Sequence, residues 1–196
     1  MRRRTLDALL TTGGLIVAAI LLAAGGLATW AGNFVSDNVT TQLSAQQIFF
    51  PAAGNPGLKD PKIGPYLNQY AGQQLTTGDQ AKAYADHYIA VHVAAATGNR
   101  SYAQVSAAAK ANPKDESLIA LKQTAFQGET LRGLLLNAYA FGTMGKIAVY
   151  AAWTSFIGAG LLLLLALLGF RHLRTVPVEK EVLVGHPKVS TNHVTA

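Results

Sequence analysis

Cysteine is absent from the 196 residues, and charged side chains make up only 13% of them. Without cysteine the chain can form no disulfide and offers no thiolate to a metal. A typical soluble domain has roughly 25% charged residues, but the deficit here is uneven. Two blocks are almost free of charge, and the segment between them has an ordinary composition. This distribution predicts two membrane spans around a soluble segment.

The two apolar blocks are residues 8–31 and 147–170, and neither contains Asp, Glu, Lys or Arg. A helix needs about 20 apolar residues to cross the hydrocarbon core of a bilayer, so each block predicts a transmembrane helix. A buried core helix is the alternative for the second block. For the first block the alternative is a signal peptide cleaved after residues 29–31. Its apolar stretch exceeds the roughly 7–15 residues of a signal core, which favours an uncleaved anchor.

Basic residues flank both blocks on the side away from the middle of the chain, at positions 2–4 and 171–174. Positive residues stay on the cytoplasmic side of a membrane. We therefore expect a plasma-membrane protein with residues 1–7 and a disordered tail, 171–196, in the cytoplasm, and residues 32–146 outside. Aromatic residues that suit the headgroup level close the opposite ends of the blocks: Trp30, Tyr150 and Trp153.

The formal charge of +6 and a pI near 9.7 do not come from one basic patch. Residues 1–7, 32–146 and 171–196 each carry two more basic than acidic side chains. Nucleic-acid binding requires basic residues gathered on one surface. The charge pattern therefore excludes nucleic acid as a partner and leaves the lipid bilayer.

The middle segment, residues 32–146, is expected to be an all-α domain. Apolar residues four apart predict a helix over 34–47. An extended piece is expected around 48–51, and three prolines, with Pro51 just before them, predict a loop over 52–65. A short helix should then end near Gly72.

Helix-capping signals divide the rest of the middle segment. Thr77 with Gln80, and Ser101 with Gln104, have capping-box spacing. The first predicts a helix that stops at Gly98, and the second a helix that ends before Pro113. The last helix begins near Asp115 and can continue into the second apolar block, with a bend allowed by Gly142 and Gly145.

The stretch "YADHYIAVH", residues 84–92, holds two of the five histidines. Metal-binding pairs on a helix are four residues apart, whereas His87 and His92 are five apart and lie roughly 140° from each other on a helical wheel. We expect no metal here, with His92 packed beside Tyr88 and His87 solvated; a metal site using both histidines is the weaker alternative. The expected buried face consists of Tyr84, Tyr88, Val91 and Ala95.

Other catalytic motifs are missing. No nucleophile elbow, phosphate loop or dinucleotide fingerprint is present, so we expect no cofactor. Glu129 and Arg132 are three residues apart and can pair across one helical turn. The apolar face beside that pair, within residues 127–142, is larger than the pair explains, and it should pack on the outer domain or on a partner.

Small residues in the apolar blocks predict a contact between helices. Ala19 and Ala23 are four apart in the first block, and Gly158 lies in the second. In lipid, helices associate where small residues let their backbones approach. We expect these residues to pack the two spans together or to bind a neighbouring subunit; the alternative is that they face lipid.

The order of a basic start, a span, "QLSAQQIFFP", "AYADHYIAVH", "SYAQV" and "QTAFQGETLRGLLLNAYAFG" leading into a span resembles an uncharacterised family of two-span actinobacterial membrane proteins. The resemblance implies a place in the cell envelope. Some members carry the name of aromatic ring-opening dioxygenases, which implies iron held by histidines and a carboxylate. Outside the predicted spans and tail, this chain offers only His87 and His92 for such a set.

The sequence therefore predicts a non-catalytic accessory or scaffold subunit of a cell-envelope assembly. Its partner would be another membrane protein or a second copy of the chain. The alternative is a membrane-anchored enzyme or ligand-binding module that uses His92 and Glu129, with Arg132 beside them. A deep polar pocket joining His92 to Glu129 would favour the alternative, and a filled core with an exposed apolar face would favour the scaffold.

Overall fold

The computed structural model describes residues 3–175, and 83% of these residues are helical with no strand among them. The predicted all-α class is confirmed. Contacts divide the chain into two compact units. The helix-pair unit comprises, within the described part, residues 3–28 and 151–175. The middle unit is Thr29–Tyr150. Residues 1–2 and 176–196 of the predicted flanks lie outside the described residues, and residues 171–175, predicted as the start of a disordered tail, are helical.

Two helices are long and apolar enough to cross a membrane: α1 (Arg3–Ala45) and α6 (Glu116–Thr175). α1 joins the first apolar block to the helix predicted over 34–47 without a break. α6 likewise joins the last predicted helix to the second block, and helical structure continues through Gly142 and Gly145. Only 17% of the most apolar window of each helix is buried, whereas the core helix of a soluble protein would be mostly buried.

The segment after α1 in the middle unit is partly extended, as predicted. The Phe50 N–H donates to the Gln73 carbonyl at 2.9 Å, and the Leu75 N–H donates to the Ile48 carbonyl at 2.8 Å. The loop predicted over 52–65 is wrong in part, because it contains the 3₁₀ helix η1 (Pro56–Lys59) and the start of α2 (Gly64–Leu67). Proline is tolerated in the first turn of a helix. The short 3₁₀ helix η2 (Asn68–Tyr70) follows.

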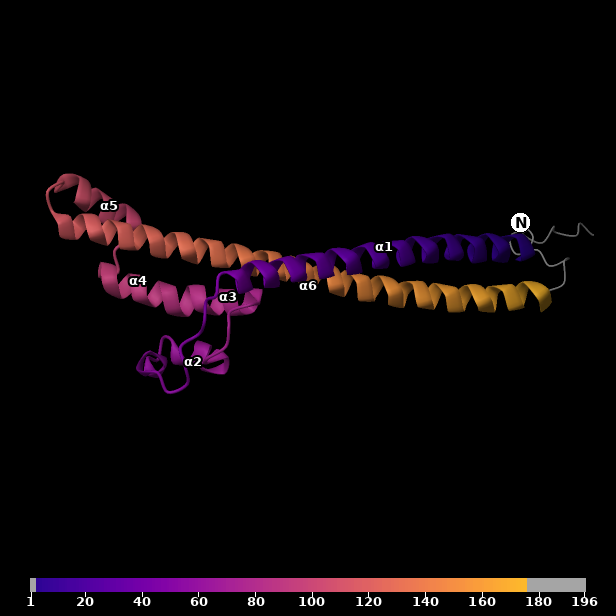
Figure 1. Cartoon of the computed structure of the whole chain (residues 1–196). Coiled ribbons are helices and arrows are strands. Elements are labelled where there is room, and N and C mark those ends of the chain that lie inside the picture. The colour runs from indigo at the N-terminus through magenta and orange to yellow at the C-terminus, as the bar shows by residue number, and fades with distance from the viewer. Residues whose placement is uncertain (1–2, 176–196) are drawn as a thin grey trace, which may run out of the picture. The chain divides into compact units, whose positions relative to one another are not determined.

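Both predicted capping boxes are present. Thr77 caps α3 (Gly78–Tyr84), and Ser101 caps α5 (Tyr102–Ala111). α3 passes through a π-helical segment, η3 (Ala85–Ile89), into α4 (Ala90–Thr97), which ends at Gly98 with φ of 62°. Figure 1 shows α5 folded back along the first turns of α6. The π-helical segment was not predicted, and it lies within the histidine-bearing stretch.

The core of the middle unit is filled. Phe50 packs against the rings of Tyr70 and Tyr84, with centroids 5.1 Å and 5.4 Å away. Gly78 lets α3 approach α6 closely, because a Cβ there would lie 3.1 Å from the Ala138 carbonyl oxygen. The apolar residues buried in the cluster are Leu43, Phe50, Leu58, Ile63, Leu67, Leu75, Ala81, Ala85, Ile89 and Leu135.

The helix-pair unit is packed through small residues that recur every seven positions. On α1 the buried residues are Thr11, Ala18 and Gly25, and on α6 they are Ala152, Ala159 and Ala166. A seven-residue repeat is typical of two helices that wind around each other with a left-handed twist. The ring of Phe156 packs directly on Gly25, since a Cβ on Gly25 would lie 2.8 Å from that ring.

The two helices therefore do not pack through Ala19 and Ala23; the alternative, that these residues bind a neighbouring subunit, stays a prediction. Ala19 and Ala23 are exposed, while their neighbour Ala18 is fully buried. Gly158 is half-buried, and a Cβ there would lie 3.3 Å from Leu21 Cδ1, so it does lie at the contact. The four-residue spacing of Ala19 and Ala23 correctly indicated small residues on α1. The seven-residue repeat, however, buries a different face of that helix.

Candidate functional site

The π-helical segment sets the positions of the two histidines. A π-helix has a wider turn than an α-helix, so a wheel drawn at 100° per residue loses register across Ala85–Ile89. Ala95, expected on the buried face, is exposed. The fully or nearly buried positions of this stretch are instead Ala81, Ala85 and Ile89. Tyr84 and Tyr88 pack beside them, as predicted.

His87 is half-buried rather than solvated, so that prediction is wrong. Its ring stacks on the ring of Tyr66, with centroids 3.5 Å apart and planes 4° from parallel. Tyr66 lies in α2, directly after the segment that was expected to be loop. Nothing in the local sequence around residue 87 points to this long-range contact.

His92 packs as predicted. Its Nδ1 lies 2.7 Å from the Tyr88 carbonyl oxygen, and its ring centroid is 4.3 Å from that of Tyr88. The two histidines thus contact different aromatic partners. Among residues 3–175, no three His, Asp or Glu side chains are grouped so that they could hold a metal ion.

Charged side chains around Asp86 connect the π-helical segment to α6. Lys82 Nζ lies 2.5 Å from one Asp86 oxygen, and Arg132 Nη2 lies 3.5 Å from the other. Arg132 also contacts Glu129 at 3.3 Å, which is the pair predicted from the sequence. The hydrogen bond from Lys82, with a further contribution from Arg132, holds the pKa of Asp86 below its usual value.

These side chains pair with one another, although the buried Nε of Arg132 has no hydrogen-bond partner. The hydrogen bond to Asp86 raises the pKa of Lys82, so both partners stay charged near neutral pH. Burial raises the pKa of Tyr84 to about 12, and the neighbouring Tyr88 adds to the effect. The contact between Asp86 and Arg132 joins the π-helical segment to α6.

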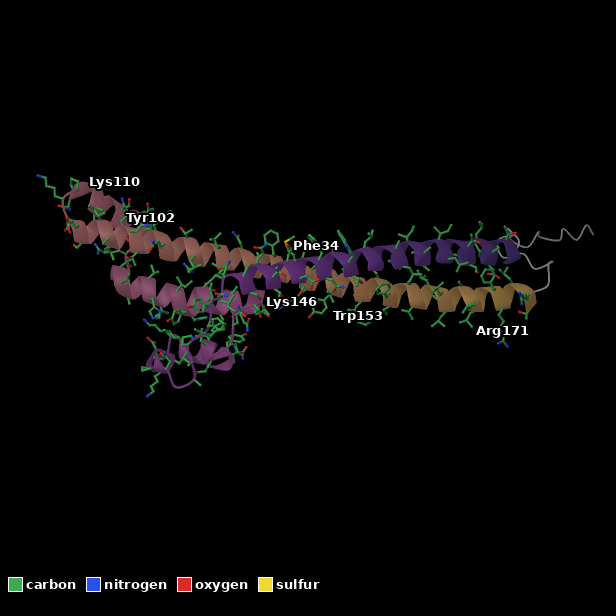
Figure 2. All side chains as sticks on the ribbon, viewed as in Figure 1. Phe34, Tyr102, Lys110, Lys146, Trp153 and Arg171 are labelled. Atoms are coloured by element: carbon green, nitrogen blue, oxygen red, sulfur yellow. The ribbon has the colours of Figure 1, made fainter. Side chains whose placement is uncertain are left out.

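An apolar groove lies between α1 and α6 in the middle unit, with a volume of about 460 Å³. Phe34, Leu134 and Phe141 line it and are 55%, 58% and 56% exposed. Figure 2 shows Phe34 projecting from α1. Gln42 and Gln46 add polar groups to the lining. The groove includes part of the apolar face that the sequence indicated over residues 127–142.

A second, more polar crevice of about 390 Å³ lies between α1, α6 and the start of α3. It contains an ion pair that the sequence did not reveal, in which Lys146 Nζ lies 2.5 Å from Asp79 Oδ2. Ser36, Thr40 and Thr77 supply hydroxyl groups to the lining. Asp79 and Lys146 are 67 residues apart in sequence, which is why helical spacing could not pair them.

Neither this crevice nor the apolar groove is lined by His92 or Glu129. A cavity of about 280 Å³ in the helix-pair unit, beside Asp7 and His172, also lacks both. Glu129 is engaged by Arg132, and His92 by the backbone of Tyr88. The pocket that would have favoured a ligand-binding role for this pair is therefore not among these cavities.

No family model matches the chain, and no curated protein or solved structure is significantly similar to it. The described residues define the class by fold: an all-helical protein with two helices long and apolar enough to span a membrane.

Proposed function

We propose that the chain is a two-span plasma-membrane protein of the cell envelope whose helical domain, residues 32–146, acts outside the cell as a non-catalytic scaffold. Both termini then lie in the cytoplasm. The basic flanks at positions 2–4 and 171–174 support this orientation. The many exposed apolar side chains of the two long helices support insertion into lipid. The resemblance to two-span actinobacterial membrane proteins supports the place in the envelope.

The apolar groove between α1 and α6 is the observation that carries the scaffold role. Its exposed residues, Phe34, Leu134 and Phe141, are not needed for the core, which is filled by other side chains. An exposed apolar surface beyond the predicted spans marks a binding surface. A groove between two helices fits a third helix laid along it. We assign it to a helix of a partner membrane protein that continues outward from its own span.

The alternative, an enzyme or ligand-binding module using His92 and Glu129, has less support. Each of these side chains already has a partner within the middle unit, and neither lines the cavities described above. Arg132 is likewise engaged with Glu129 and Asp86. These contacts favour a structural role for all three residues.

Cysteine labelling tests the orientation. Asn55→Cys should react with a membrane-impermeant maleimide in intact cells, because Asn55 is placed outside. Ser190→Cys should react only after the membrane is permeabilised. The native chain should give no labelling of its own, because it has no cysteine. Equal labelling of both variants in intact cells would contradict the orientation.

Photo-crosslinking tests the groove. A photoreactive amino acid at Leu134 should give one discrete adduct in intact cells, because a partner helix would lie within reach of the groove. The same group at the exposed Lys110, in the last turn of α5, is the matched control and should give none. Phe34→Glu should abolish the Leu134 adduct. A mass equal to two chains would identify the partner as a second copy, whereas no discrete adduct would exclude a scaffold role for the groove.

A further inference from the structure

The polar crevice around Asp79 and Lys146 has the charges to recognise a zwitterionic group. Lys146 directly precedes the second uncharged block, and Asp79 lies in the first turn of α3. Their side chains are 55% and 53% exposed despite the ion pair. The ammonium has donors beyond the one directed at Asp79, and the carboxylate has acceptor sites beyond those used by Lys146. Both charges can therefore bind a further polar group.

The place of the crevice along the chain indicates where such a group would come from. Under the proposed orientation, Lys146 and Tyr150 lie where α6 enters the outer leaflet. Tyrosine rings favour this interfacial level, and Tyr150 lines the same crevice. The hydrogen bond to Asp79 raises the pKa of Lys146, so the ammonium stays charged there. A lipid headgroup is the polar group most abundant at this depth.

We propose that this crevice binds the phosphoethanolamine headgroup of a membrane lipid, with Lys146 donating to the phosphate and Asp79 accepting from the ammonium. Hydroxyl groups of Ser36, Thr40 and Thr77 line the same space and add donors for phosphate oxygens. A binding role for the crevice goes beyond the scaffold function, but it rests on the orientation proposed above.

Charge complementarity makes the site selective among lipids. An anionic headgroup such as phosphoglycerol would pair with Lys146 but would meet the Asp79 carboxylate, and like charges repel. A phosphocholine headgroup has a quaternary ammonium, which has no N–H to donate to Asp79. Phosphoethanolamine alone among the three satisfies both side chains, and the match depends on Asp79 as much as on Lys146.

Native mass spectrometry of the full chain in mild detergent tests the proposal. The probes are phosphatidylethanolamine, phosphatidylglycerol and phosphatidylcholine with identical acyl chains. The parent chain should retain phosphatidylethanolamine best. Lys146→Gln should lower that retention by about fivefold, the upper range for one exposed ion pair, and Lys146→Arg should restore it. Asp79→Asn should raise the retention of phosphatidylglycerol to that of phosphatidylethanolamine. Lys110→Gln is the matched control and should change nothing.

Equal retention of the three lipids by the parent chain would overturn the proposal, as would unchanged retention by Lys146→Gln in protein of normal helix content. Two further probes, soluble phosphoethanolamine and inorganic phosphate, distinguish a lipid headgroup from a free ligand. Binding of either one at the crevice without any preference among lipids would assign the site to a free ligand instead. The cysteine labelling is measured on cells without added lipid, so failure of the orientation and failure of lipid selection are separate results.

Discussion

Ala18→Leu is expected to destabilise the helix-pair unit, whereas Ala19→Leu is expected to leave it unchanged. Ala18 is completely buried in the seven-residue repeat of α1, and Ala19 is exposed. A larger side chain at a close helix contact forces the backbones apart, at a cost of about 1–3 kcal/mol. In lipid no gain in apolar burial offsets that loss. The apparent thermal midpoint of the purified chain in mild detergent measures the difference.

A second pair of variants on the facing helix checks the same repeat. Ala159 is fully buried, while nothing lies within 4 Å of a Cβ placed on Gly160. Ala159→Leu should therefore lower the thermal midpoint as Ala18→Leu does. Gly160→Leu should leave the midpoint unchanged, as Ala19→Leu does. If the buried and exposed variants of either pair lowered the thermal midpoint equally, the helices would pack on another face.

Leu67→Ala is expected to give the largest loss of stability in the middle unit. Leu67 has no exposed surface and belongs to the core formed by α2, α3 and the end of α1. Truncating such a leucine removes apolar contacts and leaves a cavity, at a cost of about 2–5 kcal/mol. For a unit of this size the midpoint of thermal unfolding should fall by on the order of 10 °C. Circular dichroism of the full chain in detergent measures this change.

Leu134→Ala is the matched control, because Leu134 is 58% exposed in the groove. It should shift the midpoint little while weakening the crosslink to a partner. If Leu134→Ala lowered the midpoint as much as Leu67→Ala, the groove would be part of the folding core and not a free surface.

Local patterns predicted the helical elements well. Thr77 with Gln80, and Ser101 with Gln104, marked two helix starts, because a capping box depends only on residues three apart. Gly98 marked a helix end for an equally local reason, since its left-handed backbone suits glycine. The continuity of α1 and α6 through the ends of the apolar blocks was only partly anticipated.

Long-range contacts were beyond such patterns. The stacking of His87 on Tyr66 and the pairing of Asp79 with Lys146 each join segments that are distant in sequence. The π-helical segment Ala85–Ile89 has no signature in the propensities of its residues, so the helical wheel placed Ala95 wrongly. The error in choosing Ala19 over Ala18 has another cause: several small residues adjoin in the block, and a spacing of four does not select among them.

The repeat of small residues in the helix-pair unit has a consequence for alignment. Sliding one helix by seven residues, about 10 Å, would again bring alanine or glycine to the contact, so this packing alone specifies the alignment weakly. The contacts that do not repeat lie near one end, where Asp7 is 3.7 Å from His172 and where Gly169 leaves room for the hydroxyl of Thr11. Polar residues at single positions of such repeats select one alignment over others. Asp7 and Thr11 would then fix the alignment of the two helices. Their substitution would give a mixture of helix pairs shifted along each other, and not an unfolded helix pair.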